Sequence, residues 1–365
     1  MLEFLQVNKI LFFYLDLIRI MLNLHQNTYM KILSILFAFI TTISIHAQKP
    51  ITIGNEYTLY SKNLNEERHI YITLPSDYNE EKFKNNTYSV LYVLDAESHF
   101  SFLQAVVQKF SSGNYPSMPP LIIVGIKSKD RYKDFTSTNN SSNPTSGQSH
   151  LFTQFLEKEL KPYIQSNYRT SGYSLIIGHS LTGLYVLDCY IKAPNSFNAF
   201  IAHDPSIWWN DGQWLKDAEK SLKNNVDAHV FISQVDEKYN VGHLEKHYND
   251  IKKAKNLLYK ITNGENDFLY KQYQDEEHGS VPFKANLDAL RWVFNGYMFE
   301  IKSLYKNPEY LEQHFINFSA TKPINFYPSI SYFNNVFTYL NRVKATQSME
   351  VVKKYYTKIY PEASK

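Results

Sequence analysis

A short apolar run ends in a small-residue corner and is followed directly by a helical pattern. The run is Tyr173–Ile177, the corner is Gly178–Gly183, and the helical pattern covers Leu181–Ile191. A buried strand that turns this sharply into a helix favours a glycine-assisted corner with an exposed residue at its tip. Ser180 occupies that tip, where helix N–H groups would point at a bound carbonyl. The match to G-x-S-x-G is imperfect, because Thr182 stands in place of the second glycine.

Other short apolar runs along the chain are continuous rather than alternating, which is typical of parallel strands buried on both faces. They are Tyr88–Leu94, Leu121–Ile126, Phe200–Ala202 and His229–Ser233. Helical patterns such as Gln148–Ile164 separate several of them. Two earlier segments, Glu56–Tyr60 and His69–Leu74, alternate apolar and polar residues as half-exposed antiparallel strands do. The sequence therefore predicts an α/β fold with a doubly wound, mostly parallel sheet and antiparallel N-terminal strands.

The first part of the chain carries a targeting pattern. A basic residue precedes the apolar run Ile32–Ile45, and Ala47 could end a cleavable segment, so residues 30–47 are predicted to be a signal peptide. The run is too short for a stable membrane span. Residues 1–29 are interpreted as an upstream or untranslated segment, with a membrane anchor over Lys9–Leu24 as the alternative.

The distribution of strand patterns divides the rest of the chain into a main domain and a C-terminal extension. Residues 48–299 form the predicted main domain, because strand signals largely disappear after Phe299. Residues 300–365 read as a small helical extension, with helical patterns over Pro308–Phe318 and Ser329–Tyr360. The extension has too few elements to be stable alone, so it should pack on the main domain or on a partner, including a second copy of the chain.

A second feature agrees with the serine corner. His278 lies in the polar segment Asp275–Pro282, late in the chain, and two acidic residues, Asp236 and Glu237, precede it. Serine, acid and histidine in this order are typical of α/β-hydrolases. Serine needs a base to remove its proton, and a histidine held in one tautomer can supply that base.

The acid is predicted to be Glu237 or Asp236, because both follow a strand at its carboxyl end; a solvated loop charge or a dyad without acid are the alternatives. An oxyanion hole needs two backbone N–H donors. One should come from Leu181, directly after the serine. The other should come from Ala96, or from Asp95 beside it, after the earlier strand.

Three other groups of residues have two interpretations each. His179 lies inside the corner, where a packing residue is favoured over a base. His243 and His247 are spaced for a shared metal on a helix, but no third ligand is evident, so a surface helix is favoured. Trp208 and Trp209 could wall a pocket or cover the core. No metal or organic cofactor is required by the predicted chemistry.

Composition excludes some classes of protein. Cys189 is the single cysteine in 365 residues, so the chain can form no intramolecular disulfide and no cysteine metal site. The net charge is +3, with Lys and Arg dispersed, so nothing indicates a nucleic-acid partner.

In several ordered motifs, the chain resembles the putative esterase family of α/β-hydrolases, which includes esterase D-like enzymes and enterobactin-type siderophore esterases. The resemblance runs from about Ile51 to Phe299. It rests on the motifs Leu91–Asp95, Val124–Ile126 with Asp130–Arg131 and Asp134–Thr136, Phe155–Ile164, Gly178–Leu181, Pro205–Trp209 and His278–Pro282.

The resemblance implies that Ser180 is the nucleophile and His278 the general base. The loop around Arg131 would border the substrate cleft. From their positions in the sequence, His179, Trp208 and Trp209 are further candidate substrate-binding residues. We expect a periplasmic or secreted serine carboxyl-ester hydrolase that forms an acyl-enzyme with a small-molecule ester. A siderophore trilactone esterase and an acyltransferase are alternatives on the same site, and a non-catalytic binding protein is the alternative from another class.

Overall fold

The chain forms two compact units, Met1–Thr52 and Ile53–Lys365. The computed structural model describes residues 14–16, 18–19, 32, 51–221, 228–239, 242–262 and 267–362. The predicted signal peptide 30–47 and the upstream segment 1–29 therefore lie almost wholly outside the described residues. None of the helices described is long and apolar enough to cross a membrane. The second unit, Ile53–Lys365, is called the main unit below.

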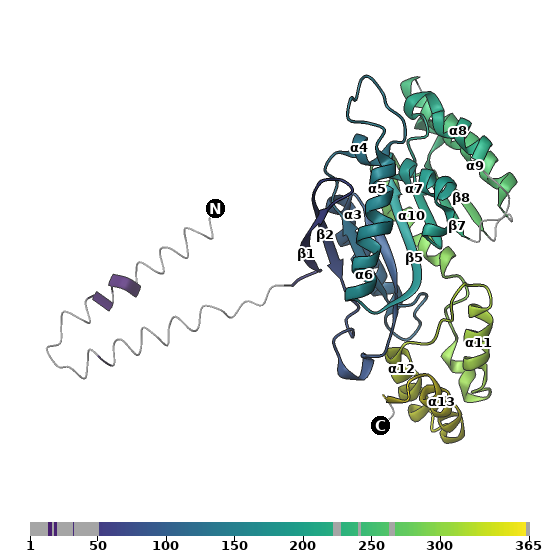
Figure 1. Ribbon diagram of the computed structural model, residues 1–365. Coiled ribbons are helices and arrows are strands. Elements are labelled where there is room, and N and C mark those ends of the chain that lie inside the picture. The colour runs from purple at the N-terminus through teal and green to yellow at the C-terminus, as the bar shows by residue number, and fades with distance from the viewer. Residues whose placement is uncertain are drawn as a thin grey trace. The chain divides into compact units, whose positions relative to one another are not determined.

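An eight-stranded sheet forms the centre of the main unit (Figure 1). Its strands are β1 (Asn55–Ser61), β2 (Glu66–Thr73), β3 (Tyr88–Leu94), β4 (Leu121–Ile126), β5 (Thr170–His179), β6 (Ala199–His203), β7 (His229–Val235) and β8 (Phe268–Tyr273). The spatial order is β1-β2-β4-β3-β5-β6-β7-β8. β2 pairs antiparallel with β1 and with β4, and the strands from β4 onward pair in parallel. The predicted α/β class, with antiparallel N-terminal strands, is confirmed.

Helices lie on both faces of the sheet, and the C-terminal helices lie at one end of the main unit (Figure 1). These helices are α3 (Ala96–Ser111), α4 (Arg131–Phe135), α5 (Ser149–Phe155), α6 (Lys161–Asn167), α7 (Leu181–Lys192), α8 (Trp209–Ser221), α9 (Glu245–Ile261), α10 (Val281–Val293) and, at the C-terminal end, α11 (Tyr310–Ser319), α12 (Ile330–Arg342) and α13 (Thr346–Ile359). The helix predicted over Gln148–Ile164 comprises α5, a π-helical segment at Leu156–Leu160 and α6. The loop predicted around Arg131 contains the short helix α4, capped by the side chain of Asp130.

The sheet separates two apolar cores, which explains the continuous apolar runs. Every residue of β3 is buried. Its even-numbered residues, such as Tyr92, pack with α5–α7 and α9, while Leu91 and Val93 pack with α3 and α10. Because successive side chains of a strand point to opposite faces, a strand buried on both faces needs apolar residues at every position.

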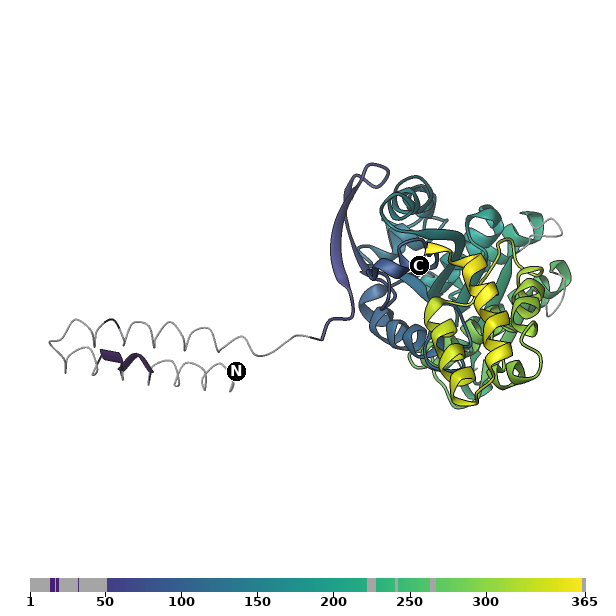
Figure 2. The same cartoon turned by 90° about the horizontal axis from the view of Figure 1, so that it is seen from below.

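The C-terminal helices α11–α13 pack within the main unit. Phe315 and Phe333 belong to the same buried cluster as Leu91 of the sheet. Figure 1 shows these helices at the end of the main unit opposite α4 and α8, and in Figure 2, which is seen from below, they lie toward the viewer. The single helix predicted over Ser329–Tyr360 is two helices, because the chain turns between α12 and α13 at Lys344, whose φ is 57°. A positive φ is uncommon for residues with a side chain and interrupts a right-handed helix.

Candidate active site

The corner between β5 and α7 is strained as the sequence predicts. Ser180 has φ 60° and ψ −115°, a sparsely populated conformation for a residue with a Cβ. The backbones before and after it approach so closely that a Cβ at Gly178 would lie 2.4 Å from the carbonyl oxygen of Thr182. Glycine at position 178 is therefore required by space. The serine hydroxyl is carried on a tight turn at the carboxyl end of a central strand.

Thr182, which replaces the second glycine of the motif, fits this corner through its hydroxyl. The side chain is fully buried. Its Oγ1 accepts the N–H of His179 at 2.8 Å. The hydroxyl proton can be donated either to the carbonyl oxygen of His179, at 2.8 Å, or to Asp95 Oδ2, at 3.1 Å. Thr182 thus satisfies polar groups of the corner that water cannot reach.

Ser180 and His278 lie together, as predicted. His278 Nε2 is 3.0 Å from Ser180 Oγ, and His278 Nδ1 is 2.6 Å from Asp204 Oδ2. Asp204 is fully buried and directly follows β6, whereas His278 lies in the loop between β8 and α10. An ionised carboxylate only accepts hydrogen bonds, so Nδ1 carries the proton and the Nε2 lone pair faces the serine hydroxyl. This tautomer can accept the serine proton.

The predicted acid residues are corrected by this geometry. The hydrogen bond from His278 goes to Asp204, not to Asp236 or Glu237. Glu237 is exposed and lies 3.8 Å from Lys252, and Asp236 accepts the N–H of Lys238 at 3.1 Å. Both follow β7, one strand farther from β5 than β6, which carries Asp204. The sequence signal for Asp204 is a carboxylate two residues after the apolar run Phe200–Ala202, at the carboxyl end of the strand beside the serine strand.

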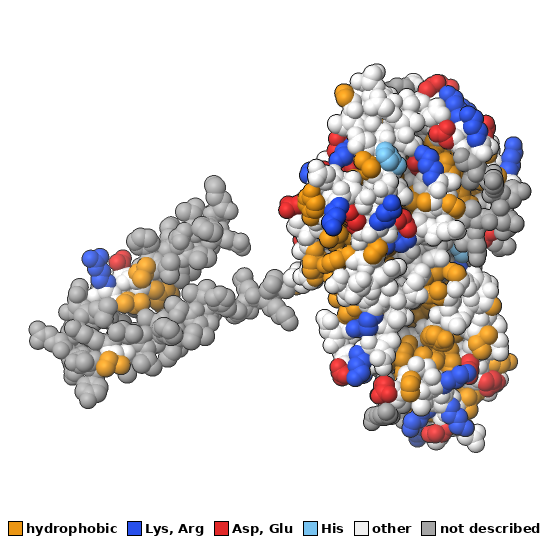
Figure 3. All heavy atoms as spheres, viewed as in Figure 1, with side chains coloured by type: hydrophobic (Ala, Val, Ile, Leu, Met, Phe, Trp, Pro, Cys, Tyr) orange, Lys and Arg blue, Asp and Glu red, His pale blue; other side chains and the backbone are white. Residues whose placement is uncertain are grey.

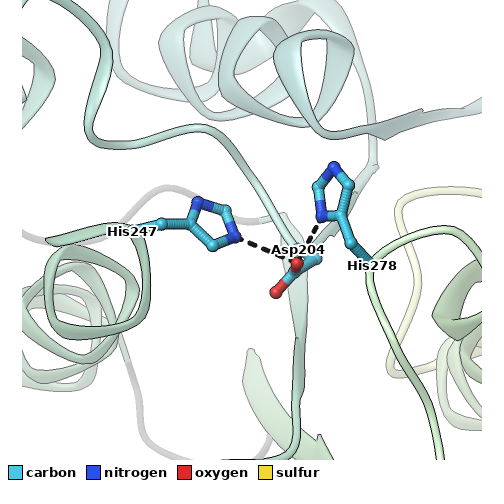
Figure 4. Close-up of side chains that lie close together, drawn as sticks. All are labelled: Asp204, His247 and His278. Carbon is cyan, nitrogen blue, oxygen red and sulfur yellow. Dashed lines mark hydrogen bonds and ion pairs between the residues drawn. The ribbon is translucent and has the colours of Figure 1, made fainter. Parts of the chain in front are cut away.

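A second imidazole contacts the same carboxylate. His247 Nε2 of α9 lies 3.0 Å from Asp204 Oδ2, and Figure 4 shows His247 and His278 approaching Asp204 from opposite sides. Burial alone would raise the pKa of Asp204, but the hydrogen bonds from His247 and His278 outweigh it and lower the pKa below its usual value. Asp204 therefore stays ionised at neutral pH.

The prediction of a surface helix is wrong for His247, whose side chain is only 12% exposed. The side chain of His243, its proposed metal partner, lies outside the described residues. Sequence spacing linked His247 to the wrong neighbour, because its contact to Asp204 joins residues 43 positions apart.

The two predicted oxyanion donors begin helices after neighbouring strands. Leu181 is the first residue of α7 after β5, and Ala96 is the first residue of α3 after β3. N–H groups in the first turn of a helix have no acceptor within that helix and are available to a ligand.

Asp95, just before α3, is organised by several donors. Its φ is 49°, and its carboxylate accepts the Nε and Nη2 groups of Arg131 at 3.1 and 2.9 Å. The hydroxyls of Ser128 and Thr182 also contact it. The guanidinium of Arg131, predicted to border the substrate cleft, thus holds Asp95 and with it the start of α3.

A cavity of ≈ 600 Å³ with a mostly apolar lining opens beside the serine. The lining residues are Ser180, Asp204, Ser206, Trp208, Val235, Leu244, His247, Tyr248, Glu277 and His278. The two alternatives for the tryptophans both occur, because Trp208 lines the cavity and is 40% exposed, whereas Trp209 is buried against Tyr132 with ring centroids 5.3 Å apart.

His179 does not contact the serine as a base. Its ring lies 4.5 Å from that of His278 and 5.7 Å from that of His99, measured between centroids. Burial, with a contribution from His278, lowers the pKa of His179 to about 3. Burial likewise lowers the pKa of His203, behind Asp204, to about 4. Both rings are therefore neutral at physiological pH and place no cation beside His278.

Comparison with known proteins agrees with this geometry. The family described as "Putative esterase" matches residues 61–291. The chain belongs to the putative esterase family. It is accordingly an enzyme that acts on esters.

Relatives of this esterase include several enzymes named for siderophores. Ferri-bacillibactin esterase BesA of Bacillus subtilis is 32% identical over 213 residues, which cover 52% of this chain and 69% of BesA. Siderophore triacetylfusarinine C esterase of Aspergillus fumigatus is 22% identical over 191 residues, covering 49% of this chain and 65% of that protein. The crystal structure of an IroE-like serine hydrolase from Shewanella oneidensis superposes with a TM-score of 0.73 at 26% identity, covering 82% of this chain and 98% of that one.

Proposed function

We propose that the esterase is a serine hydrolase that forms an acyl-enzyme on Ser180, with His278 as general base and Asp204 as the residue that orients His278. The observation that carries the proposal is the continuous hydrogen-bonded chain from Ser180 Oγ through both nitrogens of His278 to Asp204 Oδ2, with distances of 3.0 and 2.6 Å. Serine, histidine and aspartate in this arrangement perform nucleophilic acyl transfer on several unrelated folds.

In the first half of the reaction, Ser180 Oγ attacks the ester carbonyl carbon while its proton passes to His278 Nε2. The carbonyl oxygen becomes an oxyanion, for which the N–H groups of Leu181 and Ala96 are the proposed donors. The C–O bond to the alcohol then breaks, and the alcohol leaves with the proton from His278. An acyl-enzyme remains, with the acyl group on Ser180.

In the second half, water attacks the acyl carbon and gives its proton to His278, which returns it to Ser180 as the carboxylic acid leaves. Ionised Asp204 favours the imidazolium that exists between these steps. The neutral rings of His179 and His203 do not oppose that positive charge, because their pKa values are about 3 and about 4.

We further propose that the substrate is a siderophore ester, such as a cyclic trilactone. The siderophore esterase names of two relatives support this choice. The cavity of ≈ 600 Å³ beside Ser180 is wide enough for one arm of a large ligand, and Trp208 supplies an aromatic wall against which a planar group can stack.

Export is the third part of the proposal. The signal-peptide pattern over residues 30–47 supports a periplasmic or secreted enzyme. Cell fractionation of the native strain tests it. We expect the esterase outside the cytoplasm and shortened at its N-terminus by mass spectrometry; a full-length chain that fractionates with cytoplasmic marker enzymes would contradict export.

The substrate proposal is tested by incubating the purified full chain with iron-free and ferric triscatecholate trilactones and with p-nitrophenyl acyl esters, and separating the products by chromatography. We expect ring opening of a trilactone by the native chain and none by Ser180→Ala. Ser303→Ala, which changes a serine that does not line the cavity, is the matched control and should keep native activity. Cleavage of p-nitrophenyl esters without any trilactone opening would remove the siderophore and keep the esterase.

A further inference from the structure

The acyl-transfer mechanism uses one of the two imidazoles on Asp204 and leaves the other without a role. His247 comes from α9, His278 from the loop before α10 and Asp204 from the end of β6, so three separate elements converge on one point. One ligand atom from each side chain lies within 4.8 Å of those of the other two. Figure 4 shows the two rings on opposite sides of the carboxylate, with both hydrogen bonds ending on it.

Two neutral imidazoles and one carboxylate are a donor set that zinc takes in enzymes, where three protein ligands leave a fourth position for water. Room for that fourth ligand exists here, since the cavity of ≈ 600 Å³ is lined by all three side chains. Glu277 lines the same cavity and adds negative charge near a bound cation.

We propose that Asp204, His247 and His278 form a Zn²⁺ site whose occupation inhibits the esterase. The inhibition rests on the proposed function, because it needs His278 to be the base. Zinc bound to His278 Nδ1 requires the lone pair of that nitrogen, so the ring proton must move to Nε2. Nε2 then faces Ser180 as an N–H donor and cannot accept the serine proton.

The same shift of tautomer is available to His247. In the metal-free state its Nε2–H donates to Asp204, and its buried Nδ1 has no hydrogen-bond partner among the described residues. Zinc on Nε2 moves that proton to Nδ1. Each imidazole loses one proton at one nitrogen and gains one at the other, and Asp204 is already ionised, so binding needs no net release of protons.

The required movement is small. A tetrahedral zinc ion with bonds of about 2.0–2.2 Å separates its ligand atoms by roughly 3.4 Å. The two ring nitrogens now lie 2.6 and 3.0 Å from Asp204 Oδ2. Each ring nitrogen must therefore move away from Oδ2 by less than an ångström, and the two nitrogens, which lie within 4.8 Å of each other, must come together to this separation. The movement is feasible for His278 because it lies in a loop and its side chain is 49% exposed.

The test measures initial rates of the full chain on p-nitrophenyl butyrate, a simple ester without catechol groups that could bind the metal. Rates are recorded against free Zn²⁺ in a non-chelating buffer, with a blank for hydrolysis by zinc alone. We expect inhibition that EDTA reverses. Mg²⁺ should not inhibit, because it prefers oxygen ligands in octahedral geometry.

His247→Phe keeps a planar side chain and removes one ligand. Each variant is compared with its own zinc-free rate, and its fold is checked by circular dichroism. The zinc inhibition constant should rise by about tenfold or more, since even residues that only support a zinc ligand contribute 10–100-fold to affinity. His150→Phe, which changes an exposed histidine at the start of α5, is the control and should leave the inhibition constant unchanged.

Titration calorimetry with Zn²⁺ separates this site from the proposed function. Binding to the native chain that is lost in His247→Phe supports the site, even if no ester is found to be hydrolysed. Zinc inhibition of equal strength in the native chain and His247→Phe would overturn the proposal, as would active enzyme that shows no zinc binding.

Discussion

Replacing Thr182 by valine removes one hydroxyl and keeps the shape of the side chain. The native hydroxyl accepts the His179 N–H at 2.8 Å and reaches Asp95 Oδ2 at 3.1 Å, and it is fully buried. Valine leaves the His179 N–H without an acceptor where water cannot enter, which costs about 1–3 kcal/mol. Asp95 keeps its bonds from Arg131, so its contribution to the loss is small.

The effect should reach catalysis as well as stability. His179 precedes Ser180, the proposed nucleophile, and Asp95 precedes Ala96, the proposed second oxyanion donor. The Thr182 hydroxyl therefore links the strained corner to the start of α3. A strained backbone persists only when its surroundings hold it in place. A loss of about 2 kcal/mol of transition-state stabilisation lowers kcat/KM for Thr182→Val by roughly 30-fold.

The assay pairs urea unfolding with kcat/KM on a p-nitrophenyl ester. Thr182→Ser is the matched control, because it keeps the hydroxyl and loses one buried methyl group, about 1 kcal/mol. We expect Thr182→Ser to lose stability with little change in kcat/KM, and Thr182→Val to lose both. A folded Thr182→Val enzyme with native kcat/KM would refute the reasoning that this hydroxyl holds the corner.

Three further predictions follow from the same site. Gly178→Ala forces a Cβ to 2.4 Å from the Thr182 carbonyl oxygen and should lower the free energy of unfolding by about 3 kcal/mol or more. Gly279→Ala is the control and should stay close to native stability, because its Cβ meets nothing within 4 Å. Equal urea midpoints for the two variants would contradict this prediction. Trp208→Ala opens a cavity wall and should raise KM for aromatic substrates more than it lowers kcat, while Trp209→Ala should mainly reduce stability. The lowered pKa of Asp204 means that the stabilisation from its ionised form is complete above the unfolded value of about 4 and is lost as pH falls through the lower folded value. The difference in unfolding free energy between the native chain and Asp204→Asn should therefore be constant above the unfolded pKa and shrink as the pH falls below it. A difference that already shrinks near neutral pH would contradict the lowered pKa.

The central strands could be predicted from the sequence because a strand buried on both faces has a continuous run of apolar residues. Tyr88–Leu94 and Leu121–Ile126 match β3 and β4 residue for residue. β8 was not predicted, since Phe268–Tyr273 lies at the sheet edge, where Lys271 and Gln272 are partly exposed and interrupt the apolar run. The pattern of apolar residues along a strand reflects how much of the strand is buried, so a strand at the sheet edge has a weaker pattern.

The serine and histidine could be predicted, but their acid could not. Chain order requires a carboxylate between Ser180 and His278 at the carboxyl end of a strand. Both β6, followed by Asp204, and β7, followed by Asp236, satisfy this requirement. Only the spatial order of the sheet, with β6 beside β5, selects Asp204. The contacts of His247 with Asp204 and of Thr182 with Asp95 join distant segments and leave no local pattern in the sequence.

The catalytic assignment is tested most directly by labelling with a fluorophosphonate, followed by mass spectrometry of the intact and digested chain. A native chain with an activated serine should take one adduct, on Ser180. Asp204→Asn should slow the labelling by roughly ten-thousandfold, because His278 loses its orientation and its tautomer. Asp236→Asn and Glu237→Gln should label at the native rate. Labelling at another residue, or a native rate in Asp204→Asn with a slow rate in Glu237→Gln, would contradict the assignment of Ser180, His278 and Asp204.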